Sequence, residues 1–81
     1  MERKDRPVPD LVIDARDMEP PEPFVATLDA LDTMDHKHTL LLIINREPHP
    51  LYRALQKQGY AYQAELTADY SFEILIWRKQ P

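Results

Sequence analysis

The 81-residue sequence contains no cysteine and a single glycine, Gly59. Without cysteine the chain has no disulfide, no thiolate ligand for zinc or an iron–sulfur cluster, and no thiol nucleophile or sulfur carrier. With one glycine it has neither the P-loop nor the dinucleotide fingerprint, because each of these phosphate-binding motifs needs at least two. These absences exclude thiol chemistry and nucleotide binding through either motif.

Long hydrophobic runs and an excess of positive charge are also missing. The longest aliphatic run is residues 40–44, far below the roughly 20 residues of a membrane-spanning helix. Ten basic against fourteen acidic residues give a net charge of -4, which opposes binding to nucleic acid. Residues 1–10 are charged and contain proline, unlike a signal peptide. We expect a cytoplasmic protein without a membrane or nucleic-acid partner.

A chain of 81 residues with 43% hydrophobic content has room for one domain with one core. Residues 1–9 alternate in charge and include two prolines, a composition that cannot bury apolar area. The sequence therefore predicts a flexible tail over residues 1–9, a single domain over residues 10–78 and a short C-terminal tail over residues 79–81.

Hydrophobic periodicity predicts six elements within this domain. Phe24, Leu28 and Leu31 form an apolar stripe at helical spacing, and Gly59 is typical of the residue that ends a helix. The predicted strands are residues 10–14, 39–44, 60–66 and 70–77, and the predicted helices are residues 24–34 and 51–58. Three prolines in residues 20–23 suit a stiff loop that leads into the first helix.

The order β-α-β-α-β-β predicts a two-layer α/β sandwich, with an α+β arrangement of its last two strands. Right-handed crossovers make the first three strands parallel and place both helices on one face of the sheet. The fourth strand then runs antiparallel, and inserting it beside the second, in the order 1-2-4-3, puts the apolar residues 74–77 in the sheet interior. We expect a mixed four-stranded sheet in that order.

Four segments of the chain resemble the bacterial family called domain of unknown function 2249. They are residues 11–16, 19–23, 28–32 and 46–52, followed by Gly59 and Tyr60. The resemblance spans about residues 10–78 and implies a relation to the TusA/SirA sulfur-carrier group, with its translation initiation factor three C-terminal-like fold. It supplies no established activity.

In TusA proteins a Cys-Pro-x-Pro element begins the first helix, and its cysteine carries the sulfur. The corresponding element here is residues 19–22, or residues 21–23 with a small shift, and neither offers a sulfur atom. Since no other side chain forms a persulfide, the resemblance implies the TusA-like scaffold without sulfur-carrier chemistry.

The candidate binding residues lie in the two loops that follow the first and second strands. Ligands of open α/β sheets bind beyond the carboxyl ends of parallel strands, and these neighbouring loops would meet there. The candidates are Arg16, Glu19, Glu22, Arg46, Glu47 and His49. A structural role is equally open: the carboxylates could complement the helix dipoles, and Arg46 could pair with Asp14 or Asp17 to fasten the loops.

The sequence thus predicts a partner-binding or regulatory module that uses these two loops. The alternative is a small-ligand or metal-binding protein in which His49 acts with nearby carboxylates, as imidazole and carboxylate suit zinc or iron. No resident cofactor is expected. A single layer of helices on a small sheet rarely encloses the water-free pocket that catalysis needs, so we do not expect an enzyme.

The uncovered face of the sheet is a second candidate surface. Residue parity places Leu75 and Trp77 there, together with Leu41 and Ile43 of the aliphatic second strand. Exposed apolar patches usually mark association, with tryptophan a favoured anchor. We therefore expect a homodimer or a protein partner to cover this face.

Overall fold

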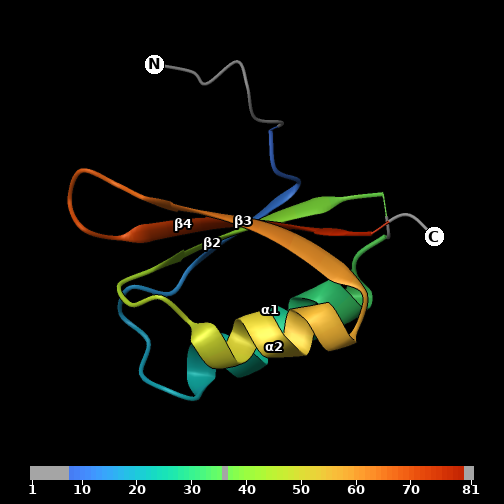
Figure 1. The fold of residues 1–81 in the computed structure, drawn as a ribbon, viewed down its shortest axis with the longest axis horizontal. Coiled ribbons are helices and arrows are strands. Elements are labelled where there is room, and N and C mark those ends of the chain that lie inside the picture. The colour runs from blue at the N-terminus through green and yellow to red at the C-terminus, as the bar shows by residue number, and fades with distance from the viewer. Residues whose placement is uncertain (1–7, 36, 80–81) are drawn as a thin grey trace.

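The computed structural model describes residues 8–35 and 37–79 as one sheet with two helices beneath it (Figure 1). The order of elements is the predicted β-α-β-α-β-β. The strands are β1 (Leu11–Asp14), β2 (Thr39–Ile44), β3 (Tyr60–Leu66) and β4 (Phe72–Arg78), and the helices are α1 (Glu22–Thr33) and α2 (His49–Lys57). The predicted tails, residues 1–9 and 79–81, fall mostly outside the described residues.

The sheet has the predicted strand order β1-β2-β4-β3. β1 pairs parallel to β2, and β4 pairs antiparallel to both β2 and β3. β4 is therefore an interior strand, which suits its apolar sequence because an interior strand has neighbours on both sides. The two-layer α/β sandwich and its mixed sheet are confirmed.

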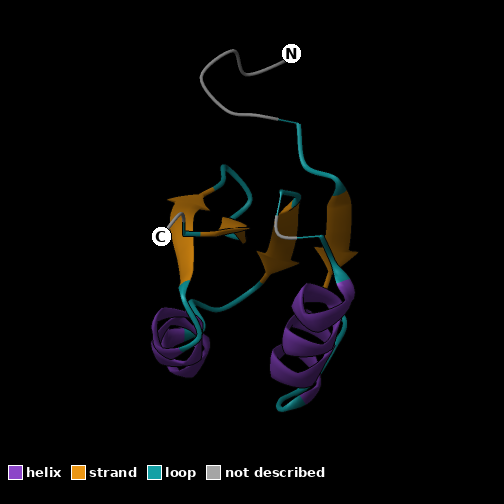
Figure 2. Ribbon diagram, turned by 90° about the vertical axis from the view of Figure 1, so that its right-hand side faces the viewer, coloured by secondary structure: helices purple, strands orange, loops and turns teal. Residues whose placement is uncertain are grey.

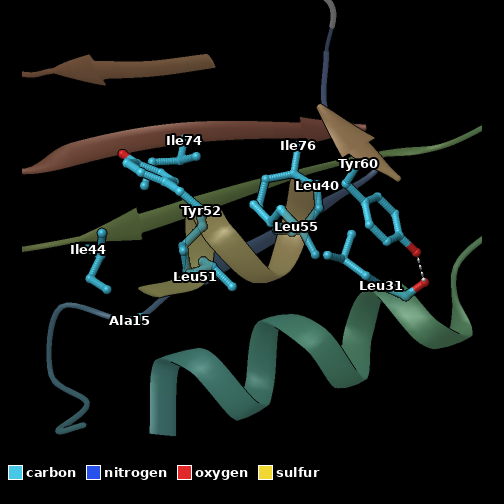
Figure 3. Packing of buried hydrophobic residues seen from close by; sticks show 11 residues of the cluster. Ala15, Leu31, Leu40, Ile44, Leu51, Tyr52, Leu55, Tyr60, Ile74 and Ile76 are labelled. Carbon is cyan, nitrogen blue, oxygen red and sulfur yellow. Dashed lines mark hydrogen bonds between the residues drawn. The ribbon is translucent and has the colours of Figure 1, made fainter. Parts of the chain in front are cut away.

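Both helices cover the same face of the sheet (Figures 1 and 2). The core lies between the layers, and Figure 3 shows Leu40 and Ile76 of the central strands beside Leu55 of α2. At one end of this core the buried Tyr60 hydroxyl donates a hydrogen bond to the Leu31 carbonyl oxygen at 3.4 Å. This contact joins the edge strand to the last turns of α1.

The uncovered face of the sheet is less exposed than the sequence predicted. Leu41 and Leu75 lie opposite each other on the two central strands, yet they retain only 9% and 2% of their accessible surface. Trp77 and Ile43 are half-buried. The expected apolar patch was wrong in extent, because each side chain on an interior strand is flanked by neighbours on both adjacent strands.

The hairpin turn between β3 and β4 is longer than predicted. Tyr70 lies outside β4, at a φ of 66°, and the Thr67 amide donates to the Ser71 carbonyl oxygen at 2.8 Å. Thr67 Oγ1 also contacts the Asp69 carboxylate and accepts from the Ser71 amide. These bonds close the turn across residues 67–71, so β4 begins at Phe72.

Gly59 follows α2 at a φ of +86°, as the sequence predicted for the residue that ends this helix. Within the described residues, no helix has the length and apolar character needed to cross a membrane.

Candidate functional site

The loops after β1 and β2 meet at one end of the sheet, as predicted. The Asn45 side-chain amide donates to the Arg16 carbonyl oxygen at 2.8 Å, and the Ala15 amide donates to the Ile43 carbonyl oxygen at 2.7 Å. These bonds continue the pairing of the parallel strands β1 and β2 into the loops. The first loop is thereby fixed against the second.

Arg16 forms an ion pair within its own loop. Its Nε and Nη2 atoms donate to the two oxygens of Asp14 at 2.9 and 2.7 Å, and its Nη1 lies 3.7 Å from Asp69 of the β3–β4 turn. The hydrogen bonds from Arg16 lower the pKa of Asp14 to about 2. The Arg16 side chain thus connects the first loop to the β3–β4 turn.

Arg46 does not make the predicted bridge. Among the described residues it has no ion pair with Asp14 or Asp17, because the closer Arg16 already holds Asp14 in a two-point contact. The bond between the loops comes instead from Asn45. Arg46 is exposed at the edge of a pocket between the two loops.

This pocket has a volume of about 210 Å³ and an apolar wall. Its lining comes from the loop after β1 with the start of α1, and from the end of β2 with the start of α2. The lining residues are Pro20, Pro21, Pro23, Phe24, Ile44, Arg46, Glu47, Pro48, Pro50 and Leu51. We call it the proline pocket, after the five prolines that form much of its wall.

The two helices that meet at the proline pocket begin with the same sequence pattern. Each starts with Pro-x-Pro followed by an apolar residue, at residues 21–24 for α1 and residues 48–51 for α2. The first proline of each pattern, Pro21 or Pro48, is the N-cap residue, and neither helix has a side-chain cap. Proline is favoured in a first helical turn because its missing N–H would have no intrahelical acceptor there. The pattern therefore starts both helices and lines the pocket between them.

Glu47, at the pocket edge, is held by residues of α2. The Tyr52 hydroxyl donates to Glu47 Oε2 at 3.1 Å, and His49 Nε2 lies 3.6 Å from Glu47 Oε1. Burial of Tyr52 and its hydrogen bond to Glu47 raise the pKa of the phenol. The Tyr52 ring also stacks on Tyr62 of β3, with ring centroids 4.2 Å apart, so Glu47 is anchored to the sheet through this tyrosine pair.

The structure brings together only part of the predicted residue set. Arg46 and Glu47 line the proline pocket, whereas the other four candidates lie outside its lining. Those four are Arg16, Glu19, Glu22 and His49. Glu22 is the first residue of α1, and its amide donates to the Glu19 carbonyl oxygen at 2.8 Å, as expected for a structural role at a helix start.

The apolar wall of the site was not predicted from the sequence. The prolines of residues 20–23 were interpreted only as a stiff loop leading into the first helix, and Phe24 only as part of an apolar helix stripe. The repeated Pro-x-Pro-apolar pattern was the available signal, since it occurs after both of the strands whose carboxyl ends meet.

No group of three metal-ligating side chains occurs within residues 8–35 and 37–79. Within the same residues, the one carboxylate in ion-pair distance of His49 is that of Glu47.

The fold defines the class of protein. The structure is similar to the crystal structure of a SirA-like protein from Desulfitobacterium hafniense, with a TM-score of 0.77 over 86% of this chain and 99% of that one. At 16% identity this likeness shows the SirA-like fold alone.

The family follows from the sequence. A family model described as "Uncharacterized conserved protein (DUF2249)" matches residues 12–78, and the chain belongs to this family. The resemblance noted in the sequence is thus confirmed. No curated protein sequence matches the chain.

Proposed function

We propose that this protein is a partner-binding or regulatory module whose proline pocket receives one apolar side chain of a protein partner. The observation that carries this proposal is the apolar wall at the meeting point of the two loops. A volume of about 210 Å³ is below the roughly 300–1,000 Å³ of pockets for drug-sized ligands. The pocket therefore suits a single bulky side chain, the usual anchor of a protein interface.

The proline wall supports binding through its rigidity. Proline has a fixed φ and loses essentially no side-chain entropy when it is covered. Binding loses conformational entropy for each flexible side chain that it immobilises. A wall of proline rings therefore binds at a lower entropic cost than a wall of long side chains.

The charges at the pocket edge favour an acidic residue beside the inserted side chain. Arg46 lines the pocket and has no ion pair among the described residues, while Glu47 already accepts a hydrogen bond from Tyr52. The free cation is therefore Arg46. A carboxylate on the partner, next to its apolar anchor, would pair with this guanidinium.

Two blocked tetrapeptides test the proposal by NMR titration. One carries Asp-Phe and the other Lys-Phe between glycines. We expect the Asp-Phe peptide to shift the amide resonances of Phe24, Ile44 and Leu51, and the Lys-Phe peptide to bind more weakly. Arg46→Ala should remove the difference between the peptides while retaining the binding of the phenylalanine.

Pro50→Asp is the variant that closes the pocket to apolar groups. Aspartate is favoured in a first helical turn, so α2 should still form while a charge enters the apolar wall. The matched control is Pro9→Asp, the same change ahead of β1 and outside the pocket lining. Peptide binding should be lost in Pro50→Asp and kept in Pro9→Asp; equal binding by both would overturn the proposal.

The small-ligand alternative is tested by the same titration with isovalerate, a small apolar carboxylate. Saturable binding of isovalerate at the pocket amides, without binding of either peptide, would replace the protein partner with a small acid. Zinc titration tests the metal alternative: shifts centred on His49 that are abolished in His49→Ala would favour it.

A further inference from the structure

Strand β3 forms one edge of the sheet, because the strand order ends with it. Its pairing with β4 is regular along its whole length. At one end of the ladder the Lys79 amide donates to the Gly59 carbonyl oxygen at 2.9 Å, and at the other the Thr67 amide donates to the Ser71 carbonyl oxygen at 2.8 Å. Hydrogen-bonded positions alternate in an antiparallel ladder. The odd-numbered residues of β3 therefore direct their backbone N–H and C=O groups toward β4.

The even-numbered residues of β3 therefore direct their backbone groups away from the sheet. These residues are Tyr60, Tyr62, Ala64 and Leu66. Within the described part of the chain, none of their N–H or C=O groups has a hydrogen-bond partner. A row of unpaired backbone groups is a template for a further strand.

β3 also lacks the features that protect an exposed edge. It contains no proline, lysine or arginine, and its one charged residue is Glu65. Such residues, or a short length, commonly prevent an edge strand from pairing with another chain. The opposite edge has this protection, since β1 is four residues long and follows Pro9, which has no N–H to donate.

We propose that β3 pairs antiparallel with β3 of a second copy of this chain, around a two-fold axis at Gln63, and forms a continuous eight-stranded sheet. In this register Tyr60 lies opposite Leu66 of the other copy and Tyr62 lies opposite Ala64. Every outward N–H and C=O of the four even-numbered residues then has a partner. A shift of two residues in either direction leaves some of these groups unpaired, so the central register is the best satisfied.

The side chains in this register match a second copy. On the helix side of the sheet, Leu66, whose side chain is 55% exposed, meets the ring of Tyr60. On the other side Glu65 meets Ala61, so the one charged position of β3 does not face its own copy. Like charges directly opposite each other destabilise a pair of strands, and this register avoids them. Because β3 is complementary to itself in this register, a second copy of the chain is favoured over a strand of an unrelated protein.

Amide hydrogen exchange on the wild-type protein tests the pairing without any substitution. In dilute solution the inward amides of Ala61, Gln63 and Glu65 should be protected, while those of Tyr62, Ala64 and Leu66 exchange fast. At high concentration these three outward amides should become protected as sedimentation shows the mass to double. A monomer at every concentration, or a dimer whose outward amides still exchange fast, would overturn the proposal.

Ala64→Pro tests the pairing by substitution. The Ala64 N–H points outward, so proline removes one bond from each copy, two in the proposed interface, and none of the ladder to β4, as is tolerated on edge strands. Ala64→Ser keeps the N–H and is the matched control. We expect Ala64→Pro to remain monomeric and Ala64→Ser to dimerise like the wild type. A folded Ala64→Pro that still dimerises would assign the interface elsewhere; if Ala64→Pro does not fold, the exchange experiment decides alone.

The dimer is independent of the proline pocket. β3 contributes no residue to the pocket lining, so peptide binding should be unchanged in Ala64→Pro. The two proposals can therefore fail separately.

Discussion

Asn45 donates its side-chain amide to the backbone carbonyl oxygen of Arg16 at 2.8 Å, and this hydrogen bond joins the two loops that form the proline pocket. The acceptor is a backbone atom, so the bond fixes the path of the first loop irrespective of where the Arg16 side chain lies. The pocket wall depends on this path, because Pro20 and Pro21 follow Arg16 in the same loop and Pro23 follows in the first turn of α1.

Asn45→Ala should therefore weaken peptide binding more than it weakens the fold. Loss of one exposed hydrogen bond costs about 1 kcal/mol of the free energy of unfolding, measured by urea denaturation. The Asp-Phe peptide should lose more affinity than this, because the loop must then be ordered on binding. Arg46→Ala is the control for stability: it removes an exposed side chain that has no ion pair among the described residues, and should change the free energy of unfolding by less than about 0.5 kcal/mol.

The fold could be predicted from the sequence because its signals are local. The short aliphatic run within residues 39–44 identifies a buried strand, and the spacing of Phe24, Leu28 and Leu31 identifies a helix face. Gly59 marks the end of α2 by a conformation that only glycine adopts at little cost. The position of β4 also followed, since an apolar strand is stabilised by neighbours on both sides.

The site could be predicted only in its location and its charged residues. The partner of an arginine depends on side-chain geometry. Arg46 was predicted to pair with Asp14 or Asp17, but Arg16, two residues from Asp14 in the sequence, holds the Asp14 carboxylate. The proline wall was missed because each Pro-x-Pro segment is fully explained by the helix that it starts. Only the packing of both helices on one face of the sheet brings these segments together.

Replacement of Arg16 should change the titration of Asp14. The pKa of Asp14 is lowered to about 2 from an unperturbed 3.8, chiefly by the hydrogen bonds from Arg16. A lowered pKa in the folded state contributes stability above pH 3.8, and this contribution is lost as the pH falls from 3.8 to about 2. In Arg16→Ala the pKa of Asp14 should rise toward 3.8 but stay below it, because the backbone amide of residue 16 still donates to Asp14 Oδ1. The free energy of unfolding should then depend less on pH in this window.

Asp69 provides the control within the same experiment. Its pKa is also lowered, but the causes are hydrogen bonds from Thr67 and Ser71 in its own turn. Arg16 Nη1 lies 3.7 Å from Asp69 but donates none of these hydrogen bonds, so the pKa of Asp69 should stay low in Arg16→Ala and change less than that of Asp14. An Asp14 titration unchanged by the substitution would show that the ion pair does not persist in solution.

Tyr70→Asn should stabilise the β3–β4 turn. Tyr70 holds a φ of 66°, a left-handed conformation that costs most residues roughly 1–2 kcal/mol and that asparagine adopts more readily. Its side chain is 78% exposed, so little packing is lost. We expect the free energy of unfolding to rise by about 0.5–1 kcal/mol. Ala68→Asn, in the same turn but without a positive φ, should bring no gain; a gain of equal size there would refute the conformational explanation.

Thr27→Val should stabilise the core. Thr27 faces inward from α1 and is fully buried, yet its hydroxyl oxygen has no hydrogen-bond partner among the described residues. An unsatisfied buried polar group costs about 1–3 kcal/mol, and valine fills nearly the same volume without that group. We expect urea denaturation to show a gain of about 1 kcal/mol in the free energy of unfolding. Thr33→Val is the matched control, because the exposed Thr33 hydroxyl donates to the Ala30 carbonyl oxygen at 3.0 Å and its loss should bring no gain. A loss of stability in Thr27→Val would mean that the Thr27 hydroxyl has a partner in solution.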